Sequence, residues 1–289
     1  MHSVVELKLH QYLDKASRGL SDMSDDTIEQ VVSHIRDALK KQFSKEEENS
    51  EFRIRMSNIG KPYCQLWFQK NKPNERIHPP AKLVMNFMLG DIVEAVFKGL
   101  LKEAGVDYED TDNEVALSIN DKTSIKGTYD LSINNTVDDI KSASMWSYNN
   151  KFQSFETVSE SDPFGYVGQL AGYAKASGKK VGGWWVINKN NADFKYVPAT
   201  GLNLNREIAK IEETVKRLEE NKFERCYEAE EEKFRGKATG NKILSKNCTF
   251  CEFRFSCWSS LVEKPQIMSK AREPKTIGYV YEKGKENTV

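Results

Sequence analysis

The stretch that decides the fold is GTYDLSINNTVDDIKSAS, residues 127–144, which places three acids and a lysine close together. Two runs of alternating apolar and polar residues flank Asn134-Asn135, and asparagine tolerates the positive φ that a tight turn needs. The pattern therefore predicts a β-hairpin with a two-residue loop. In that register Asp130 lies directly across from Asp139, with their Cβ atoms roughly 5 Å apart.

Two carboxylates directly opposite each other repel, most strongly where water is excluded. Lys141 lies on the same face as Asp139 but neutralises only part of the charge. A divalent cation between Asp130 and Asp139 would remove the penalty, and hard oxygen ligands suit Mg²⁺ or Mn²⁺. The alternative is an exposed hairpin with solvated charges. The alternation also predicts that one face of the hairpin is mostly core and the other carries the chemistry.

A long helix is predicted near residues 80–104, ending at Gly105 as helices often do. Glu94 lies on an apolar stripe of this helix, where a carboxylate is costly unless it is paired or bound to a metal. The alternative is a partly exposed glutamate at the edge of the stripe. Gly90, one turn earlier, has no side chain and could admit another element closely. The other members of the stripe are Leu83, Phe87, Phe97 and Leu101.

The rest of the chain predicts the order helix, β-rich block, helix, two strands, helix. Residues 1–50 are expected to form a helical N-terminal appendage, residues 51–262 the main domain and residues 263–289 a polar tail. Ser161, Asp162 and Pro163 give a helix-start signal. The two later strands are expected over residues 179–189 and 193–199, and a charged amphipathic helix over residues 204–223.

Composition and charge set broad limits on function. The 289 residues are 38% hydrophobic and 30% charged with a formal net charge of zero, an ordinary globular profile. This balance neither supports nor excludes nucleic acid, because a local basic groove does not change the sum. No apolar run reaches about 18 residues and the N-terminus lacks a signal-peptide core, so no membrane partner is expected. The expected location is cytoplasmic, the host cytoplasm if the protein is viral.

Four short motifs resemble the PD-(D/E)XK nuclease superfamily and, within it, the RecB-like nuclease branch. The resemblance spans about residues 60–260 and implies an α/β fold, a restriction-endonuclease-like core with a central mixed sheet flanked by helices. Many iron–sulfur members have His where Glu94 stands, whereas lambda-type viral exonucleases have Glu. The motifs, in the family's order, are GDIVE (Gly90 to Glu94), GTYD (Gly127 to Asp130), DIKS (Asp139 to Ser142) and QLAGY (Gln169 to Tyr173).

The resemblance also implies a role for each side chain. Lys141 would position or activate the attacking water and stabilise charge on the phosphate. Gln169 and Tyr173 would orient the lysine region and the DNA strand. A bound metal lowers the pKa of its water and offsets charge on the scissile phosphate. The implied ligands of Mg²⁺ or Mn²⁺ are Glu94, Asp130, Asp139 and the Ile140 carbonyl.

The five cysteines are expected to be metal ligands or free thiols in a reducing compartment. Three of them form the pattern C-x₂-C-x₅-C: Cys248, Cys251 and Cys257. Cys64 is the better candidate for a fourth ligand and Cys226 is the spare. The one-plus-three split resembles iron–sulfur RecB-like nucleases, including CRISPR-associated spacer-acquisition nucleases and AddB-type nuclease domains, and implies a structural [4Fe–4S] cluster. Zinc is an alternative, because four thiolates can hold either an iron–sulfur cluster or zinc. Unligated thiols are the other alternative.

Aromatic and basic residues surround these cysteines. Bases stack on aromatic rings and phosphates contact lysine or arginine, so these residues could hold DNA. The alternative is that the aromatic rings pack around the cysteine cluster. The residues are Trp67, Phe68, Lys70, Lys72, Phe253, Arg254, Phe255 and Trp258.

The motifs together predict a metal-dependent DNA exonuclease, acting on single- or double-stranded ends in phage recombination, repair or DNA degradation. A structure-specific or CRISPR-spacer-processing endonuclease is the first alternative. A catalytically silent DNA-binding or assembly module is the second. An annealing protein, a helicase or a CRISPR adaptation protein would be the partner besides DNA.

Overall fold

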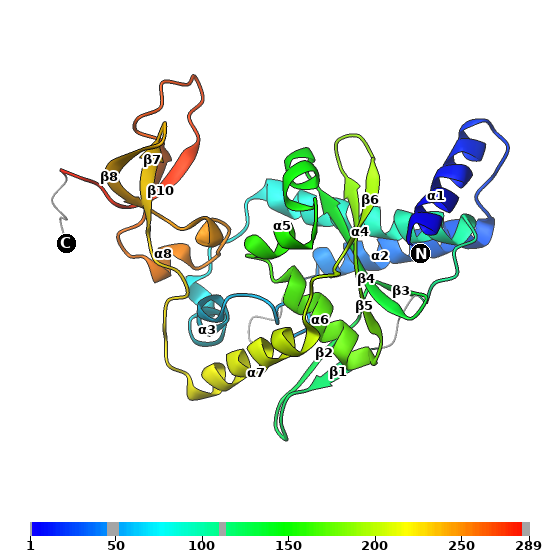
Figure 1. Cartoon of the computed structure of the whole chain (residues 1–289), viewed down its shortest axis with the longest axis horizontal. Coiled ribbons are helices and arrows are strands. Elements are labelled where there is room, and N and C mark those ends of the chain that lie inside the picture. The colour runs from blue at the N-terminus through cyan, green and yellow to red at the C-terminus, as the bar shows by residue number, and fades with distance from the viewer. Residues whose placement is uncertain (1, 45–51, 110–113, 285–289) are drawn as a thin grey trace. The chain divides into compact units, whose positions relative to one another are not determined.

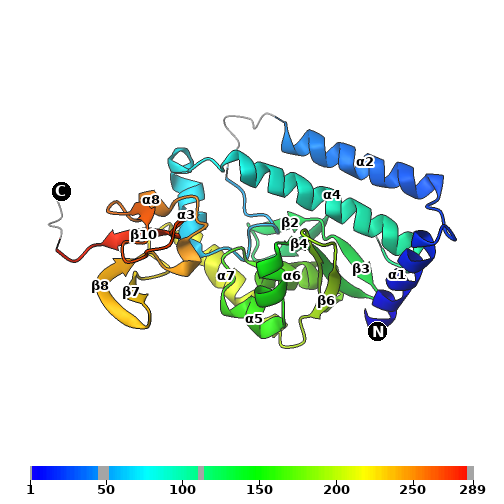
Figure 2. The same ribbon diagram turned by 90° about the horizontal axis from the view of Figure 1, so that it is seen from above.

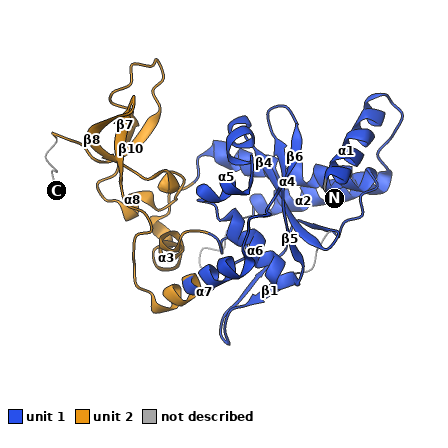
Figure 3. Ribbon diagram, in the orientation of Figure 1, with its two compact units in different colours: residues 1–60, 79–213 blue, residues 61–78, 214–289 orange. Residues whose placement is uncertain are grey.

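The computed structural model describes residues 2–44, 52–109 and 114–284 (Figure 1). The chain is mixed α/β and divides into two compact units, coloured separately in Figure 3. Unit 1 comprises residues 1–60 and 79–213, and unit 2 comprises residues 61–78 and 214–289. Among the described residues, no helix is long and apolar enough to cross a membrane.

Unit 1 contains three long helices before or beside its sheets. Its elements are α1 (His2–Ser17), α2 (Asp25–Gln42), α4 (Ala81–Glu103), β1 (Val115–Ser118), β2 (Ser124–Gly127), β3 (Leu131–Ile133), β4 (Thr136–Ala143), the π-helical turn η2 (Ser147–Lys151), α5 (Phe155–Glu160), α6 (Tyr166–Ser177), β5 (Lys180–Asn188) and β6 (Phe194–Pro198). α7 (Leu204–Glu220) contains the boundary between the units. The elements of unit 2 are α3 (Tyr63–Asn71), η1 (Pro73–Glu75), β7 (Glu230–Phe234), β8 (Lys237–Ile243), η3 (Lys246–Cys248), α8 (Arg254–Cys257), β9 (Val262–Pro265) and β10 (Thr276–Tyr281).

A four-stranded mixed sheet in the order β3-β4-β5-β6 forms the centre of unit 1. β4 pairs antiparallel with β3 and parallel with β5, and β6 pairs antiparallel with β5. Ile140 of β4 packs in a core with Phe97 of α4, whereas the next residue, Lys141, lies over the ring of Tyr166 in α6. Because successive side chains point to opposite faces, α4 and α6 cover opposite faces of the sheet.

The hairpin has the predicted two-residue loop. Ile133 pairs with Thr136, and Asn134 and Asn135 have φ values of 51° and 61°. Leu131, Ile133 and Ile140 lie in the core and Asp139 pairs with Lys141 on the other face, as the alternation predicted. Helices cover the sheet on both sides, however, so the second face is buried as well. Ser132 and Val137, which pair across the hairpin, show this burial, because Ser132 is 2% exposed and Val137 is fully buried.

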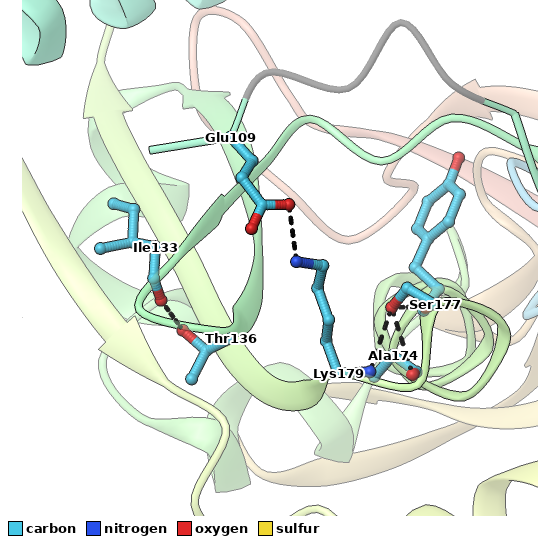
Figure 4. A network of polar contacts seen from close by, with 7 residues as sticks. Glu109, Ile133, Thr136, Ala174, Ser177 and Lys179 are labelled. Atoms are coloured by element: carbon cyan, nitrogen blue, oxygen red, sulfur yellow. Dashed lines mark hydrogen bonds and ion pairs between the residues drawn. The ribbon is translucent and has the colours of Figure 1, made fainter. Parts of the chain in front are cut away.

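The outer edge of β3 is covered by the segment that follows α4. The main-chain N–H of Ser132 donates to the Glu109 carbonyl at 3.0 Å, and the N–H of Glu109 donates back at 2.9 Å. The Glu109 carboxylate forms an ion pair with Lys179 at 2.7 Å (Figure 4). Lys179 immediately precedes β5, so the hairpin edge is tied to the connection between α6 and β5. This protects an edge strand from pairing with another chain.

The other predicted elements of unit 1 can be compared directly. The helix expected near residues 80–104 is α4, and Gly105 has a φ of 65°. The strands expected over residues 179–189 and 193–199 are β5 and β6. α6 begins later than the signal at Ser161 to Pro163, because Gly165, with a φ of 77°, is its N-cap. Asp162 instead accepts a hydrogen bond from the Val167 N–H at 2.9 Å.

The first helices are integrated into unit 1 rather than appended to it. Val5 and Leu9 of α1 are buried in the same core as Leu131 and Trp185 of the sheet. α1 packs against α4 and β6, and α2 runs beside α4 (Figure 2). This differs from the expected appendage of residues 1–50, because α1 has an apolar face that only the sheet core buries. Residues 45–50 lie outside the described residues.

Unit 2 contains a second, antiparallel sheet in the order β7-β8-β10-β9. Glu232 of β7 is 1% exposed and accepts hydrogen bonds from Asn241 and Thr239 at 2.8 Å and from Tyr279 at 2.9 Å. These donors satisfy a carboxylate that would otherwise be costly to bury. The described part of the expected polar tail therefore contributes β10 and most of β9 to a packed sheet.

The burial of α1 gives a test of its integration. Leu9→Ala should lower the free energy of unfolding by about 2–5 kcal/mol, since Leu9 is fully buried. Leu7 lies in the same helix and is 55% exposed, so Leu7→Ala should change the free energy of unfolding by no more than about 0.5 kcal/mol. Urea denaturation followed by circular dichroism measures both. Equal effects of the two substitutions would mean that α1 does not pack on the sheet.

Candidate active site

Six side chains proposed from sequence come from three elements of unit 1 and from the residue before a fourth. β4 supplies Asp139 and Lys141, and α4 supplies Glu94. Asp130 lies immediately before β3, and α6 supplies the remaining two residues, Gln169 and Tyr173.

Asp139 and Lys141 form a buried ion pair. The Lys141 Nζ lies 2.7 Å from Oδ1 and 2.6 Å from Oδ2 of Asp139, and the two side chains are 19% and 5% exposed. Burial raises the pKa of Asp139 to about 8, and Asp130 and Glu94 add to this while Lys141 opposes it. Burial would lower the pKa of Lys141, but Asp139 and Asp130 raise it above its ordinary value. Lys141 therefore keeps its proton, and the acids need further positive charge to be ionised together at neutral pH.

Asp130 is held at the end of the β3–β4 ladder. The ladder ends at the pair Leu131–Asp138, and Asp130 Oδ2 accepts a hydrogen bond from the main-chain N–H of Ile140 at 2.7 Å. Asp130 thus reaches across to the strand that carries Asp139, as the register predicted. Its charge raises the pKa of both Asp139 and Glu94, which places the three acids within electrostatic reach of one another.

Glu94 is paired within its own helix. Its Oε1 lies 2.9 Å from the Nζ of Lys98, one turn later, and its side chain is 31% exposed. Burial and then the charge of Asp130 raise the pKa of Glu94 to about 7, against the opposing effect of Lys98 and Lys141. The expected apolar stripe is buried only towards the end of α4, because Leu83 and Phe87 are 37% and 50% exposed.

Glycines allow the elements of the site to approach one another. A Cβ on Gly90 of α4 would lie 3.4 Å from the Ser142 hydroxyl of β4, so Gly90 does face another element, as predicted. A Cβ on Gly127 would lie 3.1 Å from the Tyr173 hydroxyl oxygen. Both glycines belong to the sequence motifs. A Cβ on Gly127 would crowd its neighbours, with Met56 Cβ at 2.6 Å, whereas a Cβ on Gly90 would make an ordinary contact.

Tyr173 and Gln169 lie one turn apart on the face of α6 that packs on the sheet. Tyr173 is 5% exposed, and its ring meets that of Tyr129 edge-on with centroids 6.1 Å apart. Burial and then the charge of Asp130 raise the pKa of Tyr173, and a hydrogen bond with Gln169 opposes the shift. The phenol therefore stays protonated beside the acids and can donate a hydrogen bond.

The three acids have the donor chemistry for a hard divalent cation but do not form a closed site. Among the described residues, no three His, Cys, Asp or Glu side chains form a group that could hold a metal ion as they stand. Asp139 Oδ2 is buried and lies 2.6 Å from the Nζ of Lys141, but no donor among the described residues is aligned to form a hydrogen bond to it. Carboxylate oxygens such as those of Glu94, Asp130 and Asp139 are the ligands that Mg²⁺ and Mn²⁺ prefer. The residues present therefore fit such an ion chemically.

Asp138 is a buried acid that the sequence interpretation missed. It is fully buried, and its Oδ1 accepts hydrogen bonds from the Gly183 N–H at 3.0 Å and the Tyr196 hydroxyl at 2.8 Å. A Cβ on Gly182 would lie 1.9 Å from this oxygen. The signal in the sequence was Gly182-Gly183 inside a predicted strand, which marks a close approach by another group.

Two further residues were missed at the site. Lys98 lies four residues after Glu94, and this spacing alone predicts an ion pair on a helix. Tyr166 lies three residues before Gln169 on α6, and the Nζ of Lys141 lies 5.1 Å from the centroid of its ring. Burial raises the pKa of Tyr166 to about 12. Tyr166 therefore forms one wall of the Lys141 environment.

All five cysteines belong to unit 2 and are free thiols. Burial raises the pKa of Cys248 to about 12 and that of Cys251 to about 11, and the neighbouring Cys64 and Cys257 add to both shifts. Cys226, the expected spare, lies beside Cys64, whose main-chain N–H donates to the Cys226 sulfur at 3.0 Å. As noted for the described residues, no three of these thiols form a closed metal-binding group.

The aromatic and basic residues around the cysteines are mostly engaged in packing. The rings of Phe68 and Phe253, 3% and 1% exposed, stack with centroids 5.5 Å apart. Lys70 donates to the Leu218 carbonyl at 2.6 Å, and Arg254 pairs with Glu263 at 2.6 Å. These contacts favour the packing interpretation over DNA binding. Phe255 and Lys72 are more exposed, at 39% of the residue and 46% of the side chain.

Comparisons with known proteins give little. No protein-family model matches the chain, and no curated protein matches it. Among solved structures, the chain is similar to one titled "Crystal structure of SSO0001", with 16% identity, over 64% of this chain and 85% of that chain. The TM-score is 0.40, which is too low to support any statement about the site.

The hydrogen bond on Asp138 can be tested separately from the neighbouring acids. Tyr196→Phe removes one donor from a buried carboxylate, so it should lower the free energy of unfolding by about 1–3 kcal/mol. Tyr281→Phe, at a 41% exposed position, should change it by less than about 0.5 kcal/mol. Urea unfolding curves give both values. A Tyr196→Phe protein as stable as the control would contradict a structural role for this bond.

Proposed function

We propose that the chain is a metal-dependent DNA nuclease with a restriction-endonuclease-like core, and that it degrades DNA from ends. The observation that carries the proposal is the buried Asp139–Lys141 pair with Asp130 and Glu94 in electrostatic reach. A fold that needed these groups only for stability would satisfy them better with apolar residues. The proposed setting is DNA recombination, repair or degradation in the cytoplasm, which is the host cytoplasm if the protein comes from a phage.

The proposed mechanism assigns a task to each side chain. Glu94, Asp130, Asp139 and the Ile140 carbonyl would hold Mg²⁺ or Mn²⁺, which would lower the pKa of bound water and offset charge on the phosphate. Lys141, kept protonated by Asp139 and Asp130, would stabilise negative charge on the scissile phosphate. Tyr173, whose hydroxyl stays protonated, would donate a hydrogen bond within the site, and Gln169 would orient it.

A second candidate function is favoured by a specific observation. Each acid already has a partner: Glu94 has Lys98, Asp139 has Lys141, and Asp130 has the Ile140 N–H. A catalytically silent DNA-binding or assembly module would keep such a self-contained set of contacts. An endonuclease, structure-specific or spacer-processing, is the other possibility on the same core. An annealing protein, a helicase or a CRISPR adaptation protein is the proposed partner in either case.

Nuclease activity is tested with end-labelled linear and covalently closed circular DNA in Mg²⁺, Mn²⁺ or EDTA. We expect metal-dependent loss of linear single- or double-stranded DNA and little cutting of circles. Lys141→Ala and Asp139→Ala should reduce the rate by about 10²-fold or more, because each removes charge that acts on the phosphate or the metal. Release of label from 5′ or 3′ ends gives the polarity.

Lys179→Ala is the matched control, since it removes a lysine from an ion pair in the same unit but away from the acids. It should keep wild-type activity. Cutting of circles as fast as linear DNA would favour the endonuclease. No cleavage by wild type in any metal, together with no rise in melting temperature when Mn²⁺ is added, would leave the silent module.

We further propose that the cysteines hold a structural metal group, a [4Fe–4S] cluster in preference to zinc. The implied ligands are Cys64, Cys248, Cys251 and Cys257, and the thiols of unit 2 influence one another's pKa. Four thiolates can hold either group. Such a group would close a loop between the first and last segments of unit 2 and stabilise it.

Metal and sulfide analysis of protein purified without oxygen tests this proposal. We expect iron and acid-labile sulfide in equal amounts and broad visible absorbance, which Cys248→Ser should abolish together with much of the thermal stability of unit 2. Zinc without sulfide would identify the alternative group. Protein with neither metal, unchanged in melting temperature by Cys248→Ser, would show that the thiols are unligated.

A further inference from the structure

Three aromatic rings form a stack beside the Lys141 environment. Tyr166 is common to both ring pairs, and its centroid lies 6.0 Å from that of Phe152 and 5.5 Å from that of Phe164. Both pairs are stacked, with interplanar angles of 26° and 21°. Phe152 is 3% exposed, whereas Phe164 is 41% exposed. The stack therefore leads from the core of unit 1 to an aromatic ring at the surface.

Two lysines lie over the same rings. The Nζ of Lys141 is 5.1 Å from the centroid of Tyr166. The Nζ of Lys151 is 4.7 Å from the same centroid and 5.4 Å from that of Phe164. Asp162 lies 4.0 Å from Lys151, at the limit of an ion pair. Positive charge is thus held along an aromatic stack that ends at a surface ring.

Phosphates contact lysine, and unpaired bases stack on aromatic side chains, so this combination matches one nucleic-acid strand. We propose, building on the proposed nuclease site, that Phe164 is a stacking platform for an unpaired base of single-stranded DNA. The phosphate next to that base lies at Lys151 and the scissile phosphate lies at Lys141. A base inside a duplex has both faces covered by its neighbours, so Phe164 selects a frayed or single-stranded end.

The assignment rests on the ring and not on apolar area alone. Phe164→Leu keeps an apolar side chain but removes the aromatic face, and Phe164→Trp enlarges that face. A stacking site should lose affinity with leucine and keep it with tryptophan. Phe43, an exposed phenylalanine of unit 1 that is 65% exposed and outside the stack, provides the matched control.

The experiment is binding of a fluorescein-labelled single-stranded oligonucleotide, followed by anisotropy in EDTA so that no cleavage occurs. We expect Phe164→Ala and Phe164→Leu to weaken binding by about 5- to 150-fold, as the loss of one stacked base does. Phe164→Trp and Phe43→Ala should bind like wild type. The loss should shrink when the oligonucleotide is replaced by one that carries abasic residues in place of its terminal bases. Covalently closed circular duplex DNA, which has neither ends nor an unpaired loop, should bind all variants alike.

Equal affinities of wild type and Phe164→Ala for single strands would overturn the inference, as would loss in Phe43→Ala of the same size. Because the assay needs no metal, its outcome is separate from that of the nuclease assay. A Phe164-dependent strand affinity without any cleavage would leave the stacking site standing and refute the nuclease. If Phe164→Ala cleaves DNA at the wild-type rate and binds single strands with unchanged affinity, the nuclease proposal stands and the stacking site is refuted.

Discussion

The burial of β4 on both faces is the constraint on which unit 1 depends. This strand carries Asp138, Asp139 and Lys141 through the middle of a sheet that helices cover on each side. Charges removed from water must be hydrogen-bonded or paired, or the fold is lost. Asp138 is satisfied by Gly183 and Tyr196 on one face, and Asp139 by Lys141 on the other.

Asp138 and Asp139 are adjacent in β4 but differ in how well their charges are compensated. Asp138 has two good donors and is a structural residue of the sheet. Asp139 shares its surroundings with Asp130 and Glu94, so its pKa rises to about 8 and its charge is only partly compensated. An arrangement that leaves negative charge poorly compensated in a water-poor place is typical of sites that act on a ligand. The alternation of side chains along one strand separates the two roles by a single residue.

The local features of this fold could be predicted from sequence better than the tertiary ones. The Asn134-Asn135 turn, α4 and the strands β5 and β6 follow from turn chemistry and periodicity. The burial of both hairpin faces could not be foreseen, because it depends on β5 pairing in parallel with β4 from across a helix. The place of α1 in the core and the strands after residue 262 depend in the same way on partners far along the chain. At the candidate site, motif spacing singled out Glu94, Asp130, Asp139 and Lys141. The contacts of Tyr166 with Lys141 and of Asp138 with Gly183 and Tyr196 could not be predicted, because they join residues that are distant in the sequence.

The division of the chain into units has a consequence for biosynthesis. Residues 61–78 are made before unit 1 is complete but belong to the same unit as residues 214–289, which are made after it. Cys64 and Cys226, whose main-chain N–H and sulfur lie 3.0 Å apart, are separated by 162 positions in the chain. Chains emerge from the ribosome from the N-terminus at a limited rate, and most domains fold as they become complete. Unit 1 can therefore close around its sheet during translation, while Cys64 remains without the other cysteines until residues 226–257 have been made. The nascent chain carries one isolated thiol during that interval, so any contact of Cys64 with another cysteine of unit 2 forms only after unit 1 has been synthesised.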